Sequence, residues 1–240
     1  MGAIEQLQSY IDQSRRIVFF GGAGVSTERG IPDFRSVDGL YSKTYKYPPE
    51  RIVSHSFFLA YPEDFFDFYR ERVLYLDAEP NPAHKKLAEL EKAGRLSAVI
   101  TQNIDGLHQK AGSGNVLELH GSVWRNYCIK CQKPHDITVL TTSAGVPRCP
   151  CGGLIRPDVV LYEEALDPLV LQQAEKHLRE ADLLIVGGTS LVVYPAAGLL
   201  QLYNGPLVLI NRDETPHDRR ASLLIREKIG EVFGQIRVNA

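Results

Sequence analysis

The feature that most constrains the fold is a glycine-rich turn directly after an apolar run. Residues 17–20 read Ile-Val-Phe-Phe, which is typical of a buried strand, and they lead into Gly21, Gly22 and Gly24. Glycines at the end of a strand let the backbone approach a ligand closely and expose N–H groups to a phosphate. The run therefore predicts a loop that binds a nucleotide.

This run does not follow the usual dinucleotide-binding pattern G-x-G-x-x-G. Thr27 stands where the third glycine belongs. No second strand ending in an acidic residue follows within roughly 20 residues, as that pattern requires. We therefore expect the loop to bind a dinucleotide-like ligand in a manner different from that of ordinary dehydrogenases.

Three further apolar runs also end in polar or glycine-rich residues. They lead into Gln102-Asn103, Gly188-Thr189-Ser190 and Asn211-Arg212-Asp213. Helical patterns separate these runs, which predicts an α/β fold with a parallel sheet covered by helices on both faces. Because ligands bind outside the carboxyl ends of the strands in such sheets, we expect these side chains to meet at one ligand site.

Flanking patterns predict further elements. An amphipathic helix is expected over residues 3–14, a second helix between its cap at Asn81 and Gly94, and a last helix over about 219–228. Residues 57–75 are crowded with aromatic side chains. Such crowding is typical of a helical subdomain core, and the lining of a substrate channel is the alternative.

Four cysteines gather in one loop-rich segment. Cys128-x-x-Cys131 has the spacing of a zinc ribbon, whereas Cys149-Pro-Cys151 is one residue tighter, which Gly152-Gly153 makes feasible. Four thiolates suit a tetrahedral structural zinc with no open position for water, and a redox dithiol is the alternative. The zinc would stabilise a segment that has too little core to fold alone.

Three polar positions have the character of site residues. His120 follows a short strand, and its unperturbed pKa of about 6.5 suits a general base near neutral pH, with a structural histidine as the alternative. Asn103 and Asp105 flank an isoleucine, as in a turn closed by side-chain hydrogen bonds. Alternatively they form a pocket that binds an amide such as a nicotinamide carboxamide. No G-x-S-x-G elbow supports a serine hydrolase.

Composition narrows the class of protein. The 240 residues are 44% hydrophobic and 23% charged, which is ordinary for a globular chain, and the net charge of −2 argues against a nucleic-acid binder. No apolar run approaches the roughly 20 residues of a membrane span, and no targeting segment is visible. We expect a cytoplasmic monomer with no membrane or nucleic-acid partner.

Five motifs in a fixed order identify a family resemblance. GAGVST begins at Gly22, GIPDFR at Gly30, TQNIDGLH at Thr101, ELHG at Glu118 and GTSLVVYPAA at Gly188, with the four cysteines before the last. Together they resemble the sirtuin family of NAD-dependent protein deacylases, in its short bacterial-type form. The resemblance runs from residue 16 to about 234.

The resemblance implies two domains and a reaction. An inverted Rossmann-like domain would comprise residues 1–37, 81–122 and 157–240. A small domain, made of a helical module and a zinc module, would comprise 38–80 and 123–156. The partner would be an acylated lysine of a protein or peptide. NAD would be the cosubstrate, and nicotinamide, deacylated lysine and 2′-O-acyl-ADP-ribose would be the products.

The resemblance also implies residue roles. His120 would be the catalytic base, with Asn103 as a second catalytic residue, and Zn²⁺ would be held by Cys128, Cys131, Cys149 and Cys151. The peptide would bind to Val159, Val160, Leu161, Val192 and Val193. NAD would contact Ala23, Gly24, Thr27, Asp33, Phe34, Arg35, Gln102, Asn103, Ile104, Asp105, His120, Gly188, Thr189, Ser190, Asn211, Asp213 and Ile229.

The chain departs from the family pattern in places that bear on specificity. Tyr162-Glu163-Glu164 stands where the family has Phe-Gly-Glu, beside the peptide site, and Arg29 and Ser36 replace a serine and a glycine. Relatives that remove acidic acyl groups carry a Tyr-x-x-Arg pair, and alignment on Tyr69-Arg70 places Asp67 at the tyrosine position. Its carboxylate would repel an acidic acyl group and pair with Arg70. We therefore expect deacetylation rather than desuccinylation.

Other functions remain as alternatives. The same bound NAD could serve a mono-ADP-ribosyltransferase, and a deacylase could prefer longer or acidic acyl groups. A non-catalytic module that binds NAD and zinc would not need an intact His120 and Asn103. An ordinary NAD oxidoreductase is disfavoured by the incomplete dinucleotide pattern.

Overall fold

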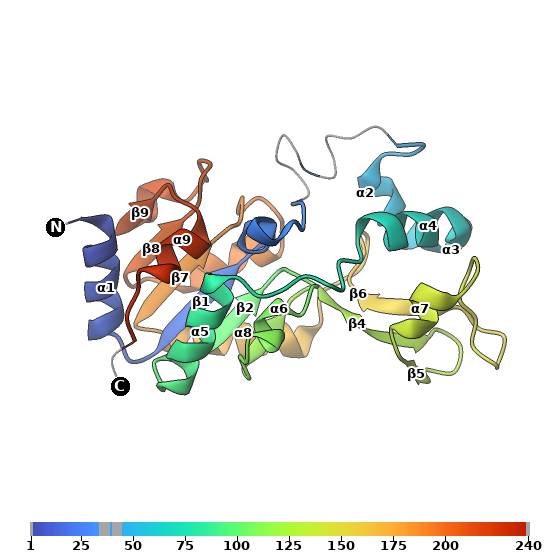
Figure 1. Ribbon diagram of the computed structural model, residues 1–240, viewed down its shortest axis with the longest axis horizontal. Helices are drawn as coiled ribbons and strands as arrows, with labels where there is room; N and C mark the ends of the chain where they lie inside the picture. Colours follow the sequence, from blue (N-terminus) through green and yellow to red (C-terminus); the bar gives the residue numbers. More distant parts are fainter. Residues whose placement is uncertain (1, 34–38, 40–44, 239–240) are drawn as a thin grey trace.

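A parallel sheet forms the centre of the larger of two units (Figure 1). The computed structural model describes residues 2–33, 39 and 45–238, and within them six strands pair in the order β3-β2-β1-β7-β8-β9. Every pairing in this sheet is parallel. The strands are β1 Ile17–Gly21, β2 Leu96–Thr101, β3 Val116–Glu118, β7 Leu183–Gly187, β8 Leu207–Ile210 and β9 Leu223–Ile225. The predicted α/β fold is confirmed.

Helices cover both faces of this sheet (Figure 1). One face carries α1 Ala3–Gln13, α5 Pro82–Lys92 and α9 Ile229–Gly234. The other carries α8 Pro168–Glu180 and the 3₁₀ helix η4 Ala196–Leu202. The short helix α6 Leu107–Lys110 follows β2. Among the described residues, no helix has both the length and the apolarity that crossing a membrane requires.

The central strand β1 shows why helices pack on both faces of the sheet. All five residues of β1 are buried. Because side chains alternate between the faces of a strand, Ile17 and Phe19 join the apolar cluster under α1 and α5, whereas Val18 and Phe20 join the cluster under α8. A continuous apolar run therefore fits a strand that is buried on both sides.

The smaller unit combines a short antiparallel sheet with helices. In the described residues its sheet has the order β5-β4-β6, with β4 Gly121–Cys128, β5 Pro134–His135 and β6 Ile155–Val159. Its helices are α2 Pro49–Ile52, α3 His55–Ala60, α4 Pro62–Arg72 and α7 Thr138–Thr142. Figure 1 shows α2, α3 and α4 above β4 and β6, away from the sheet of the large unit.

Four phenylalanines of the stretch 57–75 belong to the core of the small unit. Phe57, Phe58, Phe65 and Phe66 are buried in one cluster with side chains from β4 and β6. Phe65 and Phe66 meet edge to face, with ring centroids 5.2 Å apart. The interpretation of this stretch as a helical core is confirmed for these phenylalanines.

The helix expected over about 219–228 is wrong. That stretch contains the short 3₁₀ helix η5 Asp218–Arg220 and then β9, and the last helix, α9, begins only at Ile229. In β9, Leu223 and Ile225 are buried while Leu224 is exposed, which is the alternation of a strand at the edge of a sheet. Parallel pairing with β8 decides the conformation of these three residues.

Candidate active site

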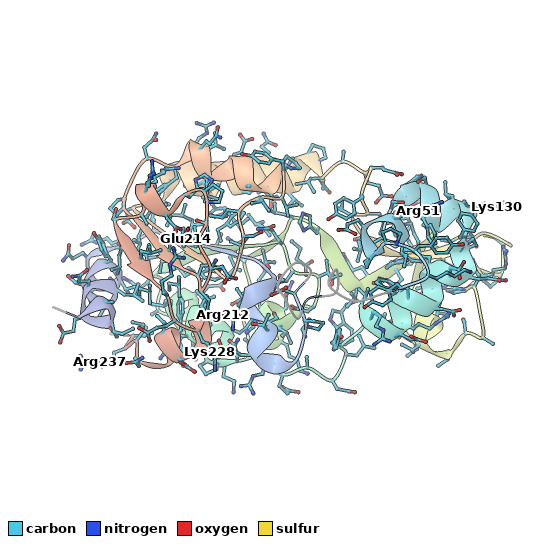
Figure 2. The ribbon with its side chains drawn as sticks, turned by 90° about the horizontal axis from the view of Figure 1, so that it is seen from above. Arg51, Lys130, Arg212, Glu214, Lys228 and Arg237 are labelled. Atoms are coloured by element: carbon cyan, nitrogen blue, oxygen red, sulfur yellow. The ribbon has the colours of Figure 1, made fainter. Side chains whose placement is uncertain are left out.

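A cavity of 1010 Å³ lies at the carboxyl ends of the central strands. Its walls include the residues that follow β1, β2, β7 and β8, as the polar strand ends predict. The small unit contributes residues from α4 and from the end of β6. Figure 2 shows Arg212, Glu214 and Lys228, which line the cavity, on the large unit, and Arg51 and Lys130 on the small unit.

The glycine-rich loop after β1 is packed against the end of β7. It forms two 3₁₀ turns, η1 Ala23–Val25 and η2 Thr27–Arg29. The amides of Gly22 and Gly24 donate to the carbonyl oxygens of Gly187 and Gly188, at 3.2 Å and 2.8 Å. A Cβ on Gly24 would lie 2.8 Å from the Cα of Gly188. These two glycines therefore serve the packing of the loop, and the prediction that their N–H groups face a phosphate is wrong.

A hydrogen-bond network holds the loop after β2 against the glycine-rich loop. Ser26 donates to Oδ2 of Asp105 at 2.6 Å, and the side-chain amide of Asn103 donates to the Ser26 hydroxyl at 3.1 Å. The other carboxylate oxygen, Oδ1 of Asp105, accepts from the amide of Leu107 at 2.9 Å. Asp105 thus closes a turn with one oxygen and bonds to Ser26 with the other, which confirms the interpretation of this stretch as a turn closed by side-chain hydrogen bonds. The residue also lines the cavity.

Burial changes the acidity of Asp105. Burial raises the pKa of this carboxyl, and the hydrogen bonds from Ser26 and from the amide of Leu107 partly counteract that rise. Ser26 was not among the predicted site residues, although it stands inside the GAGVST motif. Its hydroxyl is the link between the two loops.

Other strand ends also bond to one another. The side-chain amide of Gln102 donates to the Thr189 hydroxyl at 3.1 Å, which joins the ends of β2 and β7 across the intervening β1. Thr27 donates to the carbonyl oxygen of Gly24 at 3.1 Å and so stabilises the turn that it belongs to. The strand ends therefore form a connected polar wall.

His120 lies between β3 and β4 and lines the cavity. Its Nδ1 is 2.9 Å from the carbonyl oxygen of Gln102. Because a carbonyl can only accept, Nδ1 carries the proton, and Nε2 is the basic nitrogen of the neutral ring. Burial lowers the pKa of His120, and the bond to Gln102 offsets part of this effect. The imidazole is therefore neutral at pH 7 and able to accept a proton.

The end of β6 brings the predicted peptide segment to the same cavity. The amide of Val160 donates to the carbonyl oxygen of His120 at 3.0 Å, which fixes the spacing between this segment and the histidine. Val159, Val160, Leu161 and Val193 line the cavity. Val192 does not line it, and its side chain is 48% exposed.

Most of the predicted cofactor positions lie around this one cavity. Phe34 and Arg35 lie outside the described residues. All the others line it: Ala23, Gly24, Thr27, Asp33, Gln102, Asn103, Ile104, Asp105, His120, Gly188, Thr189, Ser190, Asn211, Asp213 and Ile229. The geometry thus gathers residues from four strand ends and from the start of α9.

The expected position of Asp67 beside the acyl group is wrong. Asp67 pairs with Arg70 at 3.7 Å as predicted, but neither residue lines the cavity. Arg70 instead donates to the carbonyl oxygens of Leu140, at 2.7 Å, and of Gly145. The pair therefore faces the zinc module and cannot repel an acyl group.

Two neighbouring residues of α4 reach the cavity in their place. Tyr69 and Arg72, spaced as Tyr-x-x-Arg, both line it. Tyr69 is 2% exposed, and its hydroxyl has no hydrogen-bond partner among the described residues. Burial raises the pKa of this hydroxyl, so it is a neutral donor. The spacing was visible in the sequence, but only the orientation of α4 shows that it meets the cavity.

The four cysteines form a compact cluster at the far end of the small unit. Their sulfur atoms all lie within 4.8 Å of one another. Gly153 is needed here, because a Cβ on it would lie 2.6 Å from the Sγ of Cys128, and Gly152 adopts a left-handed conformation with φ of 82°. The tight second pair is thus accommodated by the two glycines, and the donor set fits a tetrahedral zinc.

Comparison with known proteins gives a consistent result. The Sir2 family model matches residues 22–195. The chain is 55% identical to a protein named NAD-dependent protein deacetylase from Clostridium acetobutylicum, over 96% of this chain and 96% of the relative. It is also 55% identical to a protein of the same name from Clostridium perfringens, over 97% of this chain and 98% of the relative.

Solved structures resemble the fold over nearly the full chain. A Sir2 structure with a deacetylated p53 peptide and 3′-O-acetyl ADP ribose matches with a TM-score of 0.89 and 41% identity, covering 96% of this chain and 95% of that one. A Sir2 structure with a p53 peptide and NAD⁺ matches with a TM-score of 0.87 and 41% identity, covering 97% and 96%.

Proposed function

The chain belongs to the Sir2 family, and from this premise we propose that it is an NAD-dependent protein lysine deacetylase. The names of the relatives and the ligands of the similar structures support this activity. The observation that carries the proposal is the placement of His120. Its basic nitrogen belongs to a half-buried neutral ring, in the cavity formed by the strand ends and β6.

The residues of the cavity fit an NAD molecule. Asn211 and Asp213 at the end of β8 and Ser190 after β7 offer polar groups for the adenosine half, and Ala23 and Thr27 lie beside the position proposed for the phosphates. Asn103, Ile104 and Asp105 would surround the nicotinamide and its ribose. When bound, NAD supplies an electrophilic ribose carbon that exchanges nicotinamide for the amide oxygen of the acyl-lysine.

His120 has the protonation state that the proposed role needs. A general base must be neutral before it acts, and burial keeps the pKa of His120 below its usual value. The Gln102 carbonyl holds Nδ1, so Nε2 can take a proton from a ribose hydroxyl in the cavity. As the pH falls, the rate would be lost only below the usual histidine range, because the lowered pKa keeps the base neutral further into acid.

The acylated lysine would enter from the edge formed by the end of β6. Val159, Val160 and Leu161 would pair with the extended peptide on one side and Val193 on the other, as in the addition of a strand. Zn²⁺ would be held in a structural role by four residues that do not line the cavity: Cys128, Cys131, Cys149 and Cys151.

The test measures whether the release of nicotinamide from NAD depends on the presence of an acetyl-lysine peptide. Native protein should release nicotinamide only when the acetylated peptide is present, and His120→Ala should lower kcat by about 10² to 10⁴, the usual contribution of general base catalysis. His177→Ala, at a histidine of α8 that does not line the cavity, is the matched control. Turnover of the peptide by His120→Ala at the native rate would refute the base assignment.

A second candidate activity is the removal of acidic acyl groups. The observation that favours it is the pair Tyr69 and Arg72 in the cavity wall. The tyrosine hydroxyl is a buried donor with no partner in the part of the chain that the structure describes, and the guanidinium is a cation. A kcat/KM that is higher for succinyl-lysine than for acetyl-lysine peptide, and that falls in Tyr69→Phe, would establish this preference.

Radiolabelled NAD separates both activities from ADP-ribosyl transfer, in which the label stays on protein.

The domain division and the cellular setting are proposed with the function. The NAD-binding domain would comprise residues 1–37, 81–122 and 157–240, and the small domain 38–80 and 123–156. The separate apolar clusters of the two units support this division, although β6 crosses the boundary at residue 157. We also propose that the protein acts as a cytoplasmic monomer, without a nucleic-acid or membrane partner.

A further inference from the structure

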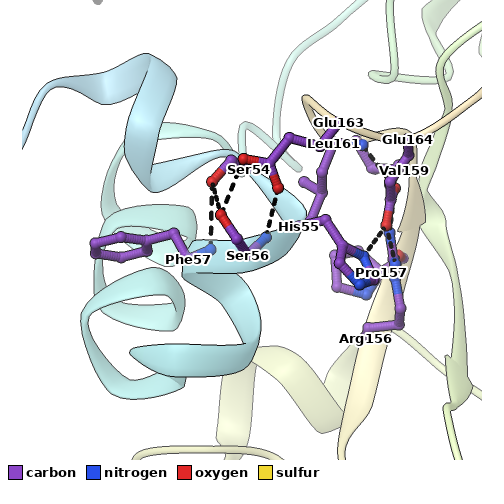
Figure 3. A network of polar contacts seen from close by, with 10 residues as sticks. All are labelled: Ser54, His55, Ser56, Phe57, Arg156, Pro157, Val159, Leu161, Glu163 and Glu164. Atoms are coloured by element: carbon purple, nitrogen blue, oxygen red, sulfur yellow. Dashed lines mark hydrogen bonds and ion pairs between the residues drawn. The ribbon is translucent and has the colours of Figure 1, made fainter.

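The segment 160–164 connects the proposed peptide site to the helices of the small unit (Figure 3). Tyr162 pairs with the stretch before α3: its amide donates to the carbonyl oxygen of Val53, and its carbonyl accepts from the amide of His55, both at 3.0 Å. The segment therefore lies against α3 on one side and borders the cavity on the other.

The side chain of Glu164 makes the first set of hydrogen bonds that holds this segment. It accepts two hydrogen bonds from the guanidinium of Arg156, at 2.5 Å and 2.9 Å, and lies 2.7 Å from Nδ1 of His55. Burial alone would raise the pKa of Glu164, but the bonds from Arg156, the amide of Leu161 and His55 lower it to about 2. Glu164 is thus a permanent anion that anchors the turn at its base.

Glu163 makes a second tie that is separate from the first. Its carboxylate accepts from both the backbone amide and the hydroxyl of Ser56, each at 2.9 Å (Figure 3). We call this pair the Ser56–Glu163 clamp. The side chain also borders the cavity, beside the segment proposed to bind the peptide.

The backbone of Glu163 is strained. Its φ is 77°, in the left-handed region that disfavours any residue with a Cβ. Glycine, which the family pattern has at this position, adopts this conformation without strain. A glutamate here is therefore unfavourable for the backbone, and the two hydrogen bonds to Ser56 are the interactions that offset the strain.

We propose that Glu163 is a positioning residue for the peptide substrate, acting through the Ser56–Glu163 clamp. The clamp holds the turn against α3 and so keeps the edge at 159–161 in place before the peptide arrives. A strand that is fixed in advance loses less conformational freedom when a peptide pairs with it. This inference rests on the proposed deacetylase function, and it concerns peptide affinity rather than the chemical step.

The clamp should not affect His120. The imidazole ring is oriented by the Gln102 carbonyl, and this bond involves neither Ser56 nor Glu163 nor the edge at 159–161. Loss of the clamp would leave the Glu164–Arg156 tie in place. The expected signature is therefore a change in KM for the peptide, with kcat and KM for NAD unchanged.

Steady-state kinetics of Glu163→Gly, with an acetyl-lysine peptide, tests the clamp. This variant removes the carboxylate and relieves the strain at once, so its thermal midpoint should stay within about 4 °C of the native value. Its KM for the peptide should rise about five-fold, as expected for two solvent-exposed hydrogen bonds. Glu163→Gln keeps an amide oxygen for the Ser56 amide, and it should restore KM to within about two-fold.

A double-mutant cycle shows whether the two residues act together. Ser56→Ala should raise the peptide KM about two-fold, and the double variant with Glu163→Ala should match Glu163→Ala alone, because the second partner is already lost. Asp64→Ala is the matched control: it removes a half-buried carboxylate from α4, 3.0 Å from Lys46, without touching the segment. The proposed role of the clamp is refuted if the KM of Glu163→Gly for the peptide equals that of the native protein. It is also refuted if the effects of the two single substitutions add in the double variant.

Hydrogen exchange keeps this inference separate from the proposed function. In the native protein the amide of Ser56 is bonded to Glu163 and that of Tyr162 to Val53. Glu163→Gly should make both amides exchange faster, whether or not the protein is a deacetylase. If the native protein turns over no acylated peptide, the function fails. If exchange at both amides is unchanged in the variant, the clamp fails.

Discussion

The large unit buries two apolar layers against its parallel sheet, whereas the small unit has one aromatic cluster and four cysteines. In the large unit, side chains of β1 meet both layers, and each layer is closed by helices. In the small unit, Cys128 and Cys149 are themselves members of the buried cluster, together with Phe58 and Phe65. Apolar burial thus suffices for one unit, while the core of the other ends at a group of thiols.

This difference indicates where each unit is vulnerable. The large unit depends on burial, so a charge brought into its core is the most damaging change. The small unit depends on a metal, because four thiolates close together repel one another when no cation neutralises them. Three perturbations, of decreasing size, test whether the two units differ in this way.

Zinc removal should have the largest effect. A chelator, or Cys131→Ser, removes binding energy on the order of 10 kcal/mol, which for a structural zinc is folding energy. Thermal unfolding should then show the small unit melting first while the large unit keeps its own transition, and peptide-dependent nicotinamide release should be lost. The measurements are zinc content, calorimetry and activity on the same sample. If the protein without zinc still unfolds in a single transition at the native midpoint temperature, the two units do not differ in this way.

Acid should weaken the large unit through two buried histidines. His84 in α5 and His108 in α6 are buried, with ring centroids 4.6 Å apart. Burial lowers the pKa of His84 to about 4 and also lowers the pKa of His108. As the pH falls below the unfolded value of about 6.5, the unfolded chain binds protons first, so stability falls.

Between pH 6.5 and pH 4, His84 alone should lower the free energy of unfolding by about 3 kcal/mol. Urea unfolding at several pH values, followed by a probe in the large unit, measures the slope. His84→Gln should flatten it. The same slope in native protein and in the variant would mean that other groups cause the acid sensitivity.

Removal of a helix cap should give the smallest loss in the free energy of unfolding. The loss should be larger for the cap in the large unit than for the cap in the small unit. Asn81 accepts from the amides of Ala83 and His84 and also donates to the carbonyl oxygen of Val25, at 2.6 Å. Ser54 caps α3 with one bond, at 3.3 Å from the amide of Phe57. We expect a loss of about 2 kcal/mol for Asn81→Ala, which also leaves a buried carbonyl unpaired, and about 1 kcal/mol for Ser54→Ala. Equal losses in denaturant unfolding would contradict this ranking.

The sequence predicted the sheet where strands are continuous apolar runs. The apolar run at residues 17–20 lies in β1, and the three runs that lead into Gln102, Gly188 and Asn211 form β2, β7 and β8. β9 was missed because it has only three residues and becomes a strand through its pairing with β8. Patterns along the chain thus specify buried strands, whereas an edge strand depends on its neighbour.

The site was predictable to the extent that it lies at strand ends. Gln102 and Thr189, far apart in the chain, were placed together by the rule for parallel sheets, and they are hydrogen-bonded. Tyr69 and Arg72 could not be found in this way, because they reach the cavity from a helix of the other unit. The amides of Gly22 and Gly24 were misjudged because no local pattern shows that a neighbouring strand has already engaged them.

The place of β1 in the sheet has a consequence for biosynthesis. Ile17 pairs with Leu96 on one side and with Leu183 on the other, so the central strand is made early and gains its second neighbour late. At about 5–20 residues per second, a ribosome needs roughly ten to thirty seconds to supply β7 after β1. During that time the apolar residues of β1 have no partner on one edge, and such pairing between distant segments is intrinsically slow. The nascent chain therefore exposes one unpaired edge of β1 until β7 emerges.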